Sequence, residues 1–547
     1  MFLRRFASII LVLVGAAMLL FAVSISNGTY ASVLLGRQSA ALSWGPSLFR
    51  LLLCLHGVLL VSLGLYESKL HHRAGKSRAT GPKRSERITP IVLSILVALS
   101  LLALILRLWN LNSDLWIDEV LTLLDFVRKP LGEIVVSFPS QNQHMLFSIL
   151  ARISTNIFGE NPWALRLPSV LFGVISIWAF FFMCRSLLNT GTALLGSTLL
   201  TVSYHHIWFS QNARGYMGLL LFTLLATWCW LEGIRSNERR WWIGYTASVV
   251  LGMWIHPTMA FVVAAQGLVH LVLLAAPGLS GDKDVGASPE RRAGWRPFAS
   301  WLLSITVTLQ LYALALPEFL SVGLHEESKN SEWTNPLWVI SESLKSLSIG
   351  FAGMAVVLIG GAFVAFGWTS LFRTNRRAAV LLVLPAILAG ATMVLLGHNI
   401  WPRFFFFSMG FGLMIVIHGA MRLPEALGTW VGWLRVRPSL TRYAGVGACL
   451  LIIAASLATV SRNYALPKQN YSGAKNYVEA NFAAGDKLIA VSLAGVVYGS
   501  YLTPYWPVAK TDSDLEPLQA HQNVWLVYTL SPEIKAFHPE MWRRIET

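Results

Sequence analysis

Residues 91–120 read I-V-L-S-I-L-V-A-L-S-L-L-A-L-I-L-R-L-W-N-L-N-S-D-L-W-I-D-E-V, and this stretch decides the class of the fold. Its apolar part, residues 91–108, carries a single charge, Arg107, and is long enough to cross a bilayer as a helix. The sequence then turns polar and ends in two adjacent carboxylates, Asp118 and Glu119. Ionised groups beside hydrocarbon are costly, so carboxylates at the edge of a membrane indicate a functional or structural need for them.

The whole chain has the composition of a membrane protein. Its 547 residues are 55% hydrophobic and 13% charged, whereas soluble proteins carry about a quarter charged residues. Apolar runs recur along the chain and predict a polytopic, all-α protein with about thirteen transmembrane helices. The expected spans are residues 7–25, 47–66, 90–109, 162–184, 192–209, 215–234, 241–256, 258–276, 298–316, 350–371, 378–397, 404–421 and 443–461.

The net charge of +16 is explained by the loops between these spans. Every second loop is basic, and loops of that kind stay in the cytoplasm. These loops are residues 67–89, 185–191, 235–240, 277–297, 372–377 and 422–442. The long loops 110–161 and 317–349 are acidic and are expected outside. The excess charge therefore indicates a cytoplasmic N-terminus and an extracytoplasmic C-terminus, and it does not indicate a nucleic-acid partner.

Three regions follow from this organisation. Residues 1–89 hold two extra N-terminal spans and a basic cytoplasmic loop, and residues 90–461 form the main transmembrane domain. Residues 462–547 have a mixed polar composition and are expected to fold outside the membrane as a small α/β domain. In that domain, residues 472–482 have helical spacing, and residues 487–492 and 523–529 are typical strands.

The loop 110–161 is too long for an unstructured connection. Residues 118–128 are helix-like, Pro130 suits the first turn of a second helix, and residues 144–158 have one apolar face. The loop is therefore expected to contain helices that lie at the membrane surface.

Carboxylates, arginines and histidines gather at the outer ends of the expected spans. A guanidinium matches the oxygens of a phosphate, and a carboxylate opposite it could take a proton from an attacking hydroxyl. This combination indicates group transfer from a phosphate-activated lipid. The residues concerned are Asp118, Glu119, His144, Arg166, Arg214, His256 and Arg403.

The order of these residues also resembles a known family. The segments that carry the resemblance are L-W-I-D-E-V (115–120), H-M-L-F-S-I-L (144–150), F-G-E-N-P-W-A-L-R-L-P-S-V-L-F-G (158–173), Q-N-A-R-G-Y (211–216) and P-R-F (402–404). They are similar to integral-membrane glycosyltransferases of the GT-C superfamily. The nearest pattern is glycosyltransferase family 39, which includes the protein O-mannosyltransferases and aminoarabinose transferases. The resemblance covers residues 90–420.

The resemblance implies an inverting transfer of a sugar from a polyprenyl-phosphate donor to a hydroxyl of a glycan, lipid or protein acceptor. The reaction would occur on the non-cytoplasmic face of a bacterial inner membrane. Asp118 would be the general base, with Glu119 in the same catalytic site. Arg166, Arg214 and Arg403 would bind the donor phosphate. The resemblance further implies a possible divalent metal ion, with His144 and His256 as candidate ligands alongside Glu119.

Several alternatives stay open at this stage. Asp118 and Glu119 could instead favour the positive end of a helix dipole, and Arg166 could reach toward lipid headgroups. The main rival function is a transporter or flippase of lipid-linked glycans. Transporters typically place charges at the membrane midplane within inverted repeats, whereas these charges lie at the outer ends of spans. A non-catalytic assembly scaffold that uses the C-terminal domain is a third reading.

Overall fold

The structure is a computed structural model that describes residues 2–26, 28–29, 44–70, 88–280, 293–323, 331–350, 353–430, 438–465, 468–520 and 523–546. The basic loops expected at 67–89, 277–297 and 422–442 lie partly outside these described residues.

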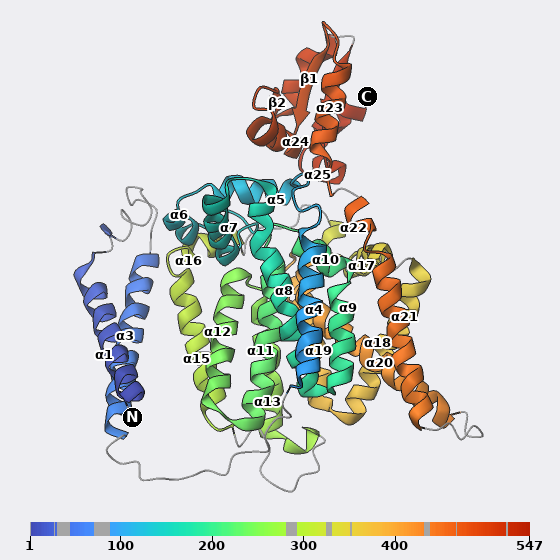
Figure 1. Ribbon diagram of the computed structural model, residues 1–547. Helices are drawn as coiled ribbons and strands as arrows, with labels where there is room; N and C mark the ends of the chain where they lie inside the picture. The colour runs from blue at the N-terminus through green and yellow to red at the C-terminus, as the bar shows by residue number, and fades with distance from the viewer. Residues whose placement is uncertain are drawn as a thin grey trace. The chain divides into compact units, whose positions relative to one another are not determined.

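Helices dominate the membrane part, as predicted (Figure 1). Among the described residues, eight helical segments are long and apolar enough to cross a membrane. They involve α3 (Gly45–Leu70), α4 (Pro90–Leu108), α8 (Pro162–Leu187), α11 (Tyr216–Ser236), α18 (Met354–Thr374), α19 (Arg376–Leu395), α20 (Met409–Trp430) and α21 (Pro438–Ala458). Further apolar helices are α1 (Phe2–Ser24), α9 (Thr190–Thr201), α12 (Arg239–Ile255), α13 (Met259–Ala275) and α15 (Arg296–Tyr312). The polytopic all-α prediction is confirmed, and most of the expected spans coincide with a single helix. The expected span 298–316 runs past the end of α15, and the expected span 404–421 begins in a 3-10 helix.

The chain divides into two compact units. The first consists of residues 1–97, 130–146 and 222–326, and the second of residues 98–129, 147–221 and 327–547. In the first unit, α1 packs along α3 and α12 packs along α15. Phe138, Met145, Tyr312 and Ala315 form a small core there.

In the second unit, α20 packs against both α18 and α21. Gly367 on α18 and Gly419 on α20 face one another so closely that a Cβ on either would overlap the backbone of the other helix. Small residues at such a crossing let two helices in lipid approach each other.

One expected span, residues 192–209, is broken into α9 and α10 (Tyr204–Ser210). Arg107 of α4 is fully buried beside the break and donates two hydrogen bonds to the carbonyl of Thr201, at 3.2 and 3.3 Å. It also bonds to His206 Nδ1 and donates to Ser210 Oγ. Irregular backbone inside a membrane protein is tolerated where other protein groups satisfy it. Arg107 has that role here.

The first long loop contains the expected short helices. They are α5 (Ile117–Thr122), α6 (Leu131–Val136) and α7 (Met145–Phe158). The first predicted helix, residues 118–128, is α5 followed by a π-helical turn at Leu123–Val127. Turns of this kind occur often at functional sites.

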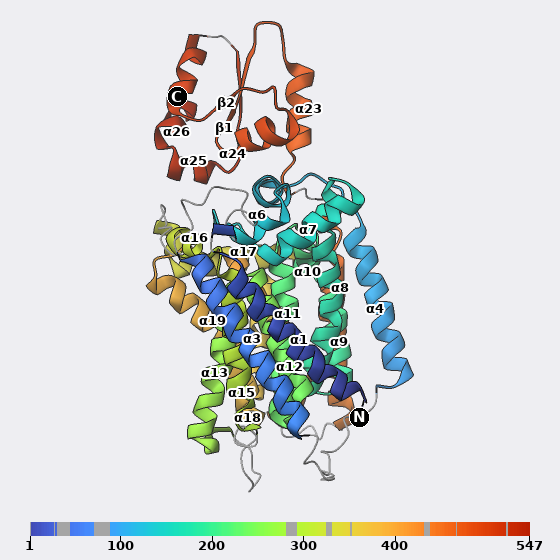
Figure 2. The same cartoon turned by 90° about the vertical axis from the view of Figure 1, so that its left-hand side faces the viewer.

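The C-terminal residues form the predicted α/β domain. Its parallel sheet has the order β2-β1-β3, with β1 (Lys487–Val491) between β2 (Val508–Ala509) and β3 (Val524–Val527). Figure 2 shows α23 (Tyr471–Asn481) and α26 (Pro539–Glu546) on opposite sides of these strands. The core of the domain is formed by Ile489, Val491, Ala509, Leu515, Ile534 and Met541.

Candidate active site

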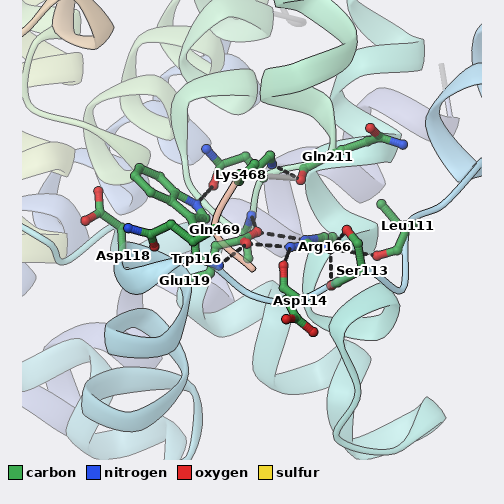
Figure 3. A network of polar contacts seen from close by, with 12 residues as sticks. Leu111, Ser113, Asp114, Trp116, Asp118, Glu119, Arg166, Gln211, Lys468 and Gln469 are labelled. Carbon is green, nitrogen blue, oxygen red and sulfur yellow. Dashed lines mark hydrogen bonds and ion pairs between the residues drawn. The ribbon is translucent and has the colours of Figure 1, made fainter. Parts of the chain in front are cut away.

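Asp118 and Glu119 both lie in the first turn of α5 but have different surroundings. Consecutive helical residues point about 100° apart. The Glu119 side chain is completely buried, whereas that of Asp118 is 16% exposed. Figure 3 shows Asp118 directed away from the polar network that surrounds Glu119.

Glu119 forms a bidentate ion pair with Arg166. Arg166 donates from Nε to Glu119 Oε1 at 2.8 Å and from Nη2 to Oε2 at 2.6 Å. Glu119 also accepts the backbone N–H groups of Ala213 at 2.6 Å and Trp116 at 3.2 Å. Burial by itself raises the pKa of Glu119. The charges of Arg166 and Lys468 and the bonds from Arg166 and Ala213 outweigh it, so this pKa lies below its usual value.

Arg166 uses every N–H that it has within this network. Besides its two bonds to Glu119, Nη1 donates to the carbonyls of Leu111 and Ser113 and to Ser113 Oγ, and Nη2 donates to the carbonyl of Asp114. A guanidinium has five N–H groups, and all five have protein acceptors here. Arg166 therefore ties residues 111–119 into one rigid loop, and this arrangement leaves it no N–H for the donor phosphate expected from the sequence.

Asp118 is paired with Arg403 of a later segment. Arg403 Nη1 lies 3.2 Å from Asp118 Oδ2. Arg403 belongs to a 3-10 helix (Pro402–Ser408) and is 31% exposed. Its guanidinium carbon lies 5.2 Å from the ring centre of Trp401. Unlike Arg166, this guanidinium keeps a buried Nε that has no hydrogen-bond partner among the described residues.

Arg214 lies in the loop that also supplies Ala213 to Glu119. Its Nη1 donates to Thr122 Oγ1 at 3.4 Å, and its guanidinium carbon is 5.6 Å from the ring centre of Tyr216. Arg214 is buried, and within the part of the chain that the structure describes its Nε has no hydrogen-bond acceptor. Arg214 and Arg403 are thus the two cations of the predicted set that keep donor capacity.

The two histidines expected as metal ligands belong to the first unit. The rings of His144 and His256 are 4.9 Å apart between their centres, and His256 Nδ1 lies 2.8 Å from Thr258 Oγ1. No group of three or more His, Cys, Asp or Glu that could hold a metal ion occurs among the described residues. Protein sites for zinc usually use three or four such ligands. The described residues therefore do not by themselves build the expected metal site.

Lys468 is a site residue that the sequence did not reveal. It lies beyond the last span, after α22 (Arg462–Ala465), and its Nζ donates to the carbonyls of Trp208, at 3.5 Å, and Gln211. The same Nζ lies 4.6 Å from the ring centre of Trp208. Burial lowers the pKa of Lys468 to about 7, with Glu119 opposing this shift and Arg166 adding to it. A single lysine in a polar linker gives no signal of such an environment.

The depressed pKa of Lys468 predicts a pH-dependent stability. In the unfolded chain this amine has its ordinary pKa of 10.5. Between the pKa of the folded protein and that value, the unfolded chain therefore binds more protons than the folded protein does, and the free energy of unfolding rises with pH. We expect the melting temperature of the purified protein to increase from pH 7 to pH 9. Lys468→Met should show a clearly smaller increase. An identical pH dependence in both proteins would contradict this interpretation of Lys468.

Comparisons with known proteins identify similar sequences and folds. A family model described as dolichyl-phosphate-mannose-protein mannosyltransferase matches residues 142–280. A comparison with curated protein sequences gave no match. Among solved structures, ArnT from Cupriavidus metallidurans bound to undecaprenyl phosphate has 13% identity and a TM-score of 0.50. That match covers 80% of this chain and 90% of ArnT.

Two further structures are similar. The apo form of the same ArnT has 14% identity and a TM-score of 0.50, with 82% of this chain and 94% of ArnT covered. The apo oligosaccharyltransferase of Archaeoglobus fulgidus has 13% identity and a TM-score of 0.48, with 75% and 64% covered. The expected resemblance is confirmed: residues 142–280 are similar to the mannosyltransferase family model, and this multi-pass membrane protein has the fold of ArnT.

Proposed function

We propose that the protein is an inverting glycosyltransferase that moves a sugar from a polyprenyl phosphate to an acceptor hydroxyl, with Asp118 as general base. The observation that supports this proposal is the difference in surroundings between the adjacent carboxylates. Glu119 is buried and fully bonded, whereas Asp118 is partly exposed and faces Arg403. A carboxylate that accepts a proton must be reachable by substrate, and of this pair Asp118 is the more exposed.

In this reaction the acceptor oxygen attacks the anomeric carbon of the sugar from the face opposite the phosphate. Asp118 takes the proton from that oxygen as the new C–O bond forms. The bond between the anomeric carbon and the phosphate oxygen breaks, and its electron pair leaves on the polyprenyl phosphate. Attack from the opposite face inverts the anomeric configuration.

The leaving phosphate gains negative charge as the bond breaks, so cations beside it stabilise the transition state. We assign this role to Arg403 and Arg214, because each retains an Nε without a protein acceptor in the described structure. ArnT, which has the same fold, has been solved with undecaprenyl phosphate bound. We assign Arg166 and Glu119 to the support of the loop that carries Asp118. A divalent metal is left out of the mechanism, since His144 and His256 form only a pair within the described residues.

Arg403 provides the test of phosphate binding. We expect Arg403→Met to weaken binding of undecaprenyl phosphate by about tenfold or more, which corresponds to a charge-assisted bond worth about 1.5–3 kcal/mol. Binding is measured by thermal shift of the purified protein, with undecaprenol as the uncharged control ligand. The difference in thermal shift between the two lipids should be smaller for the variant than for the wild type, with Arg214 still present. If the variant still prefers the phosphate as strongly as the wild type does, Arg403 does not bind the donor phosphate.

The sugar and acceptor can be found in cells. A deletion strain is compared with its parent for lipid-linked sugars and cell-envelope glycans. A transferase in the inner membrane with its site outside predicts that one polyprenyl-phosphate sugar accumulates while one glycan loses that sugar. Loss of transport without loss of sugar transfer in membrane extracts would favour the flippase instead.

A further inference from the structure

Within the second unit, residues 111–119, which form the loop that leads into α5, make hydrogen bonds with the C-terminal α/β domain and its linker. These bonds lie at the starts of two helices. Gln469, in the connection that precedes the domain, accepts the backbone N–H of Ile117 at 2.7 Å through Oε1. In the other direction, Asp114 of the loop accepts the backbone N–H of Ser472 at 2.7 Å and its hydroxyl at 2.8 Å. Ile117 begins α5, and Ser472 lies in the first turn of α23. Each segment therefore caps the helix of the other.

The cap on α5 is needed because of the local sequence. The first N–H groups of a helix have no partner inside it, and a side-chain oxygen at the preceding residue usually accepts one of them. The residue before Ile117 is Trp116, which has no such oxygen. The helix has only six residues, and helices this short are not stable by themselves. Gln469 thus supplies from a distant part of the chain the acceptor that the local sequence lacks.

Gln469 is itself fixed to the α/β domain. Its Nε2 donates to Thr529 Oγ1 at 3.1 Å, and its Oε1 accepts the hydroxyl of Tyr471 at 2.9 Å. Thr529 follows β3 closely, so the amide of Gln469 links the sheet of the domain to the start of α5. The neighbouring Lys468 belongs to the same linker and donates a hydrogen bond to the carbonyl of Gln211, which fixes the linker at a second point.

We propose that Gln469 is a positioning residue for Asp118, and that the α/β domain is through this cap a working part of the transferase site. The proposal rests on the proposed function, in which Asp118 is the base. Asp118 directly follows Ile117, so the hydrogen bond from the Ile117 N–H to Gln469 fixes the position of the backbone next to Asp118. Misplacement of a catalytic group by about 1 Å costs about 10²-fold in rate.

The kinetic test uses the full-length protein in lipid nanodiscs with the radiolabelled lipid-linked sugar that accumulates in the deletion strain. We expect Gln469→Leu to lower kcat about 10- to 100-fold, while the KM for the lipid-linked sugar stays within about twofold. Gln469→Glu keeps an Oε1 acceptor for Ile117 and should recover part of the lost rate. Asn481→Leu is the matched control, because this exposed amide donates within α23, to the carbonyl of Tyr477. It should behave as the wild type does.

A second measurement keeps the proposal testable without catalysis. Hydrogen exchange of the peptide covering residues 111–123 should become at least about tenfold faster in Gln469→Leu than in Asn481→Leu. Unchanged exchange and an unchanged kcat would overturn the proposal, and so would a rise in KM alone. If the wild type transfers no sugar but the exchange result holds, the proposed function fails while the capping role of Gln469 stands.

Discussion

Replacing Asp118 by Asn is expected to lower the rate of sugar transfer by roughly 10²–10⁴-fold, the usual contribution of a general base. The amide keeps the size of the side chain but cannot take the proton from the acceptor hydroxyl. Because Arg403 and Arg214 keep their places, binding of undecaprenyl phosphate should change little. The rate is measured with protein in lipid nanodiscs under single-turnover conditions, which separate chemistry from product release.

Asp125→Asn is the matched control for this experiment. Asp125 lies in the π-helical turn that follows α5, and burial raises the pKa of its carboxyl. It is not part of the proposed mechanism, so the same carboxyl-to-amide change there should leave transfer near the wild-type rate. Equal rates for Asp118→Asn and the wild type would exclude Asp118 as the base. Equal losses in both variants would point to a general effect on the loop.

Replacing Arg166 by Met should have the largest effect on stability. The change leaves Glu119 buried without its cation and removes the donors to the carbonyls of Leu111, Ser113 and Asp114. Breaking a buried ion pair from one side costs about 3–5 kcal/mol. We expect a lower melting temperature in detergent, together with loss of transfer, because the loop that carries Asp118 is no longer held.

A double-mutant cycle distinguishes this explanation from a simple loss of packing. In Glu119→Gln/Arg166→Met, the uncompensated carboxylate is gone, so the double variant should be more stable than the sum of the two single losses predicts. Additive losses would contradict the assignment of Arg166 to Glu119. A specific loss of undecaprenyl phosphate binding, with stability unchanged, would instead restore Arg166 as a phosphate ligand.

Hydropathy predicted most of the spans because bilayer thickness sets a similar minimum length for each of them. It failed at residues 192–209, where no Gly or Pro marks the break between α9 and α10. The carbonyl at that break is satisfied by Arg107, which is 94 positions away in sequence. Local patterns contain no information about such a partner.

In the candidate site, too, local patterns could be predicted from the sequence, whereas long-range contacts could not. The D-E pair and its place directly after a span could be predicted from residues 91–120. That arginines of later loops lie on the same side as these carboxylates was expected from the order of spans and loops. The sequence could not predict which arginine contacts which carboxylate, because Arg166 and Arg403 are the same residue type and are equally plausible phosphate ligands. Gln469 lies 352 positions from Ile117. Only the fold brings these two residues together, so the sequence around Gln469, a polar linker, could not reveal its contact with Ile117.

Sugar transfer and lipid movement are distinguished by one experiment that follows both the sugar and its lipid. Purified protein is placed in proteoliposomes with the radiolabelled lipid-linked sugar that accumulates in the deletion strain, and a membrane extract supplies the acceptor. We expect the label to pass to the acceptor with inverted anomeric configuration, and one polyprenyl phosphate to be released for each sugar transferred. If the sugar stays on its lipid while the lipid changes leaflet, the protein is a flippase and not a glycosyltransferase.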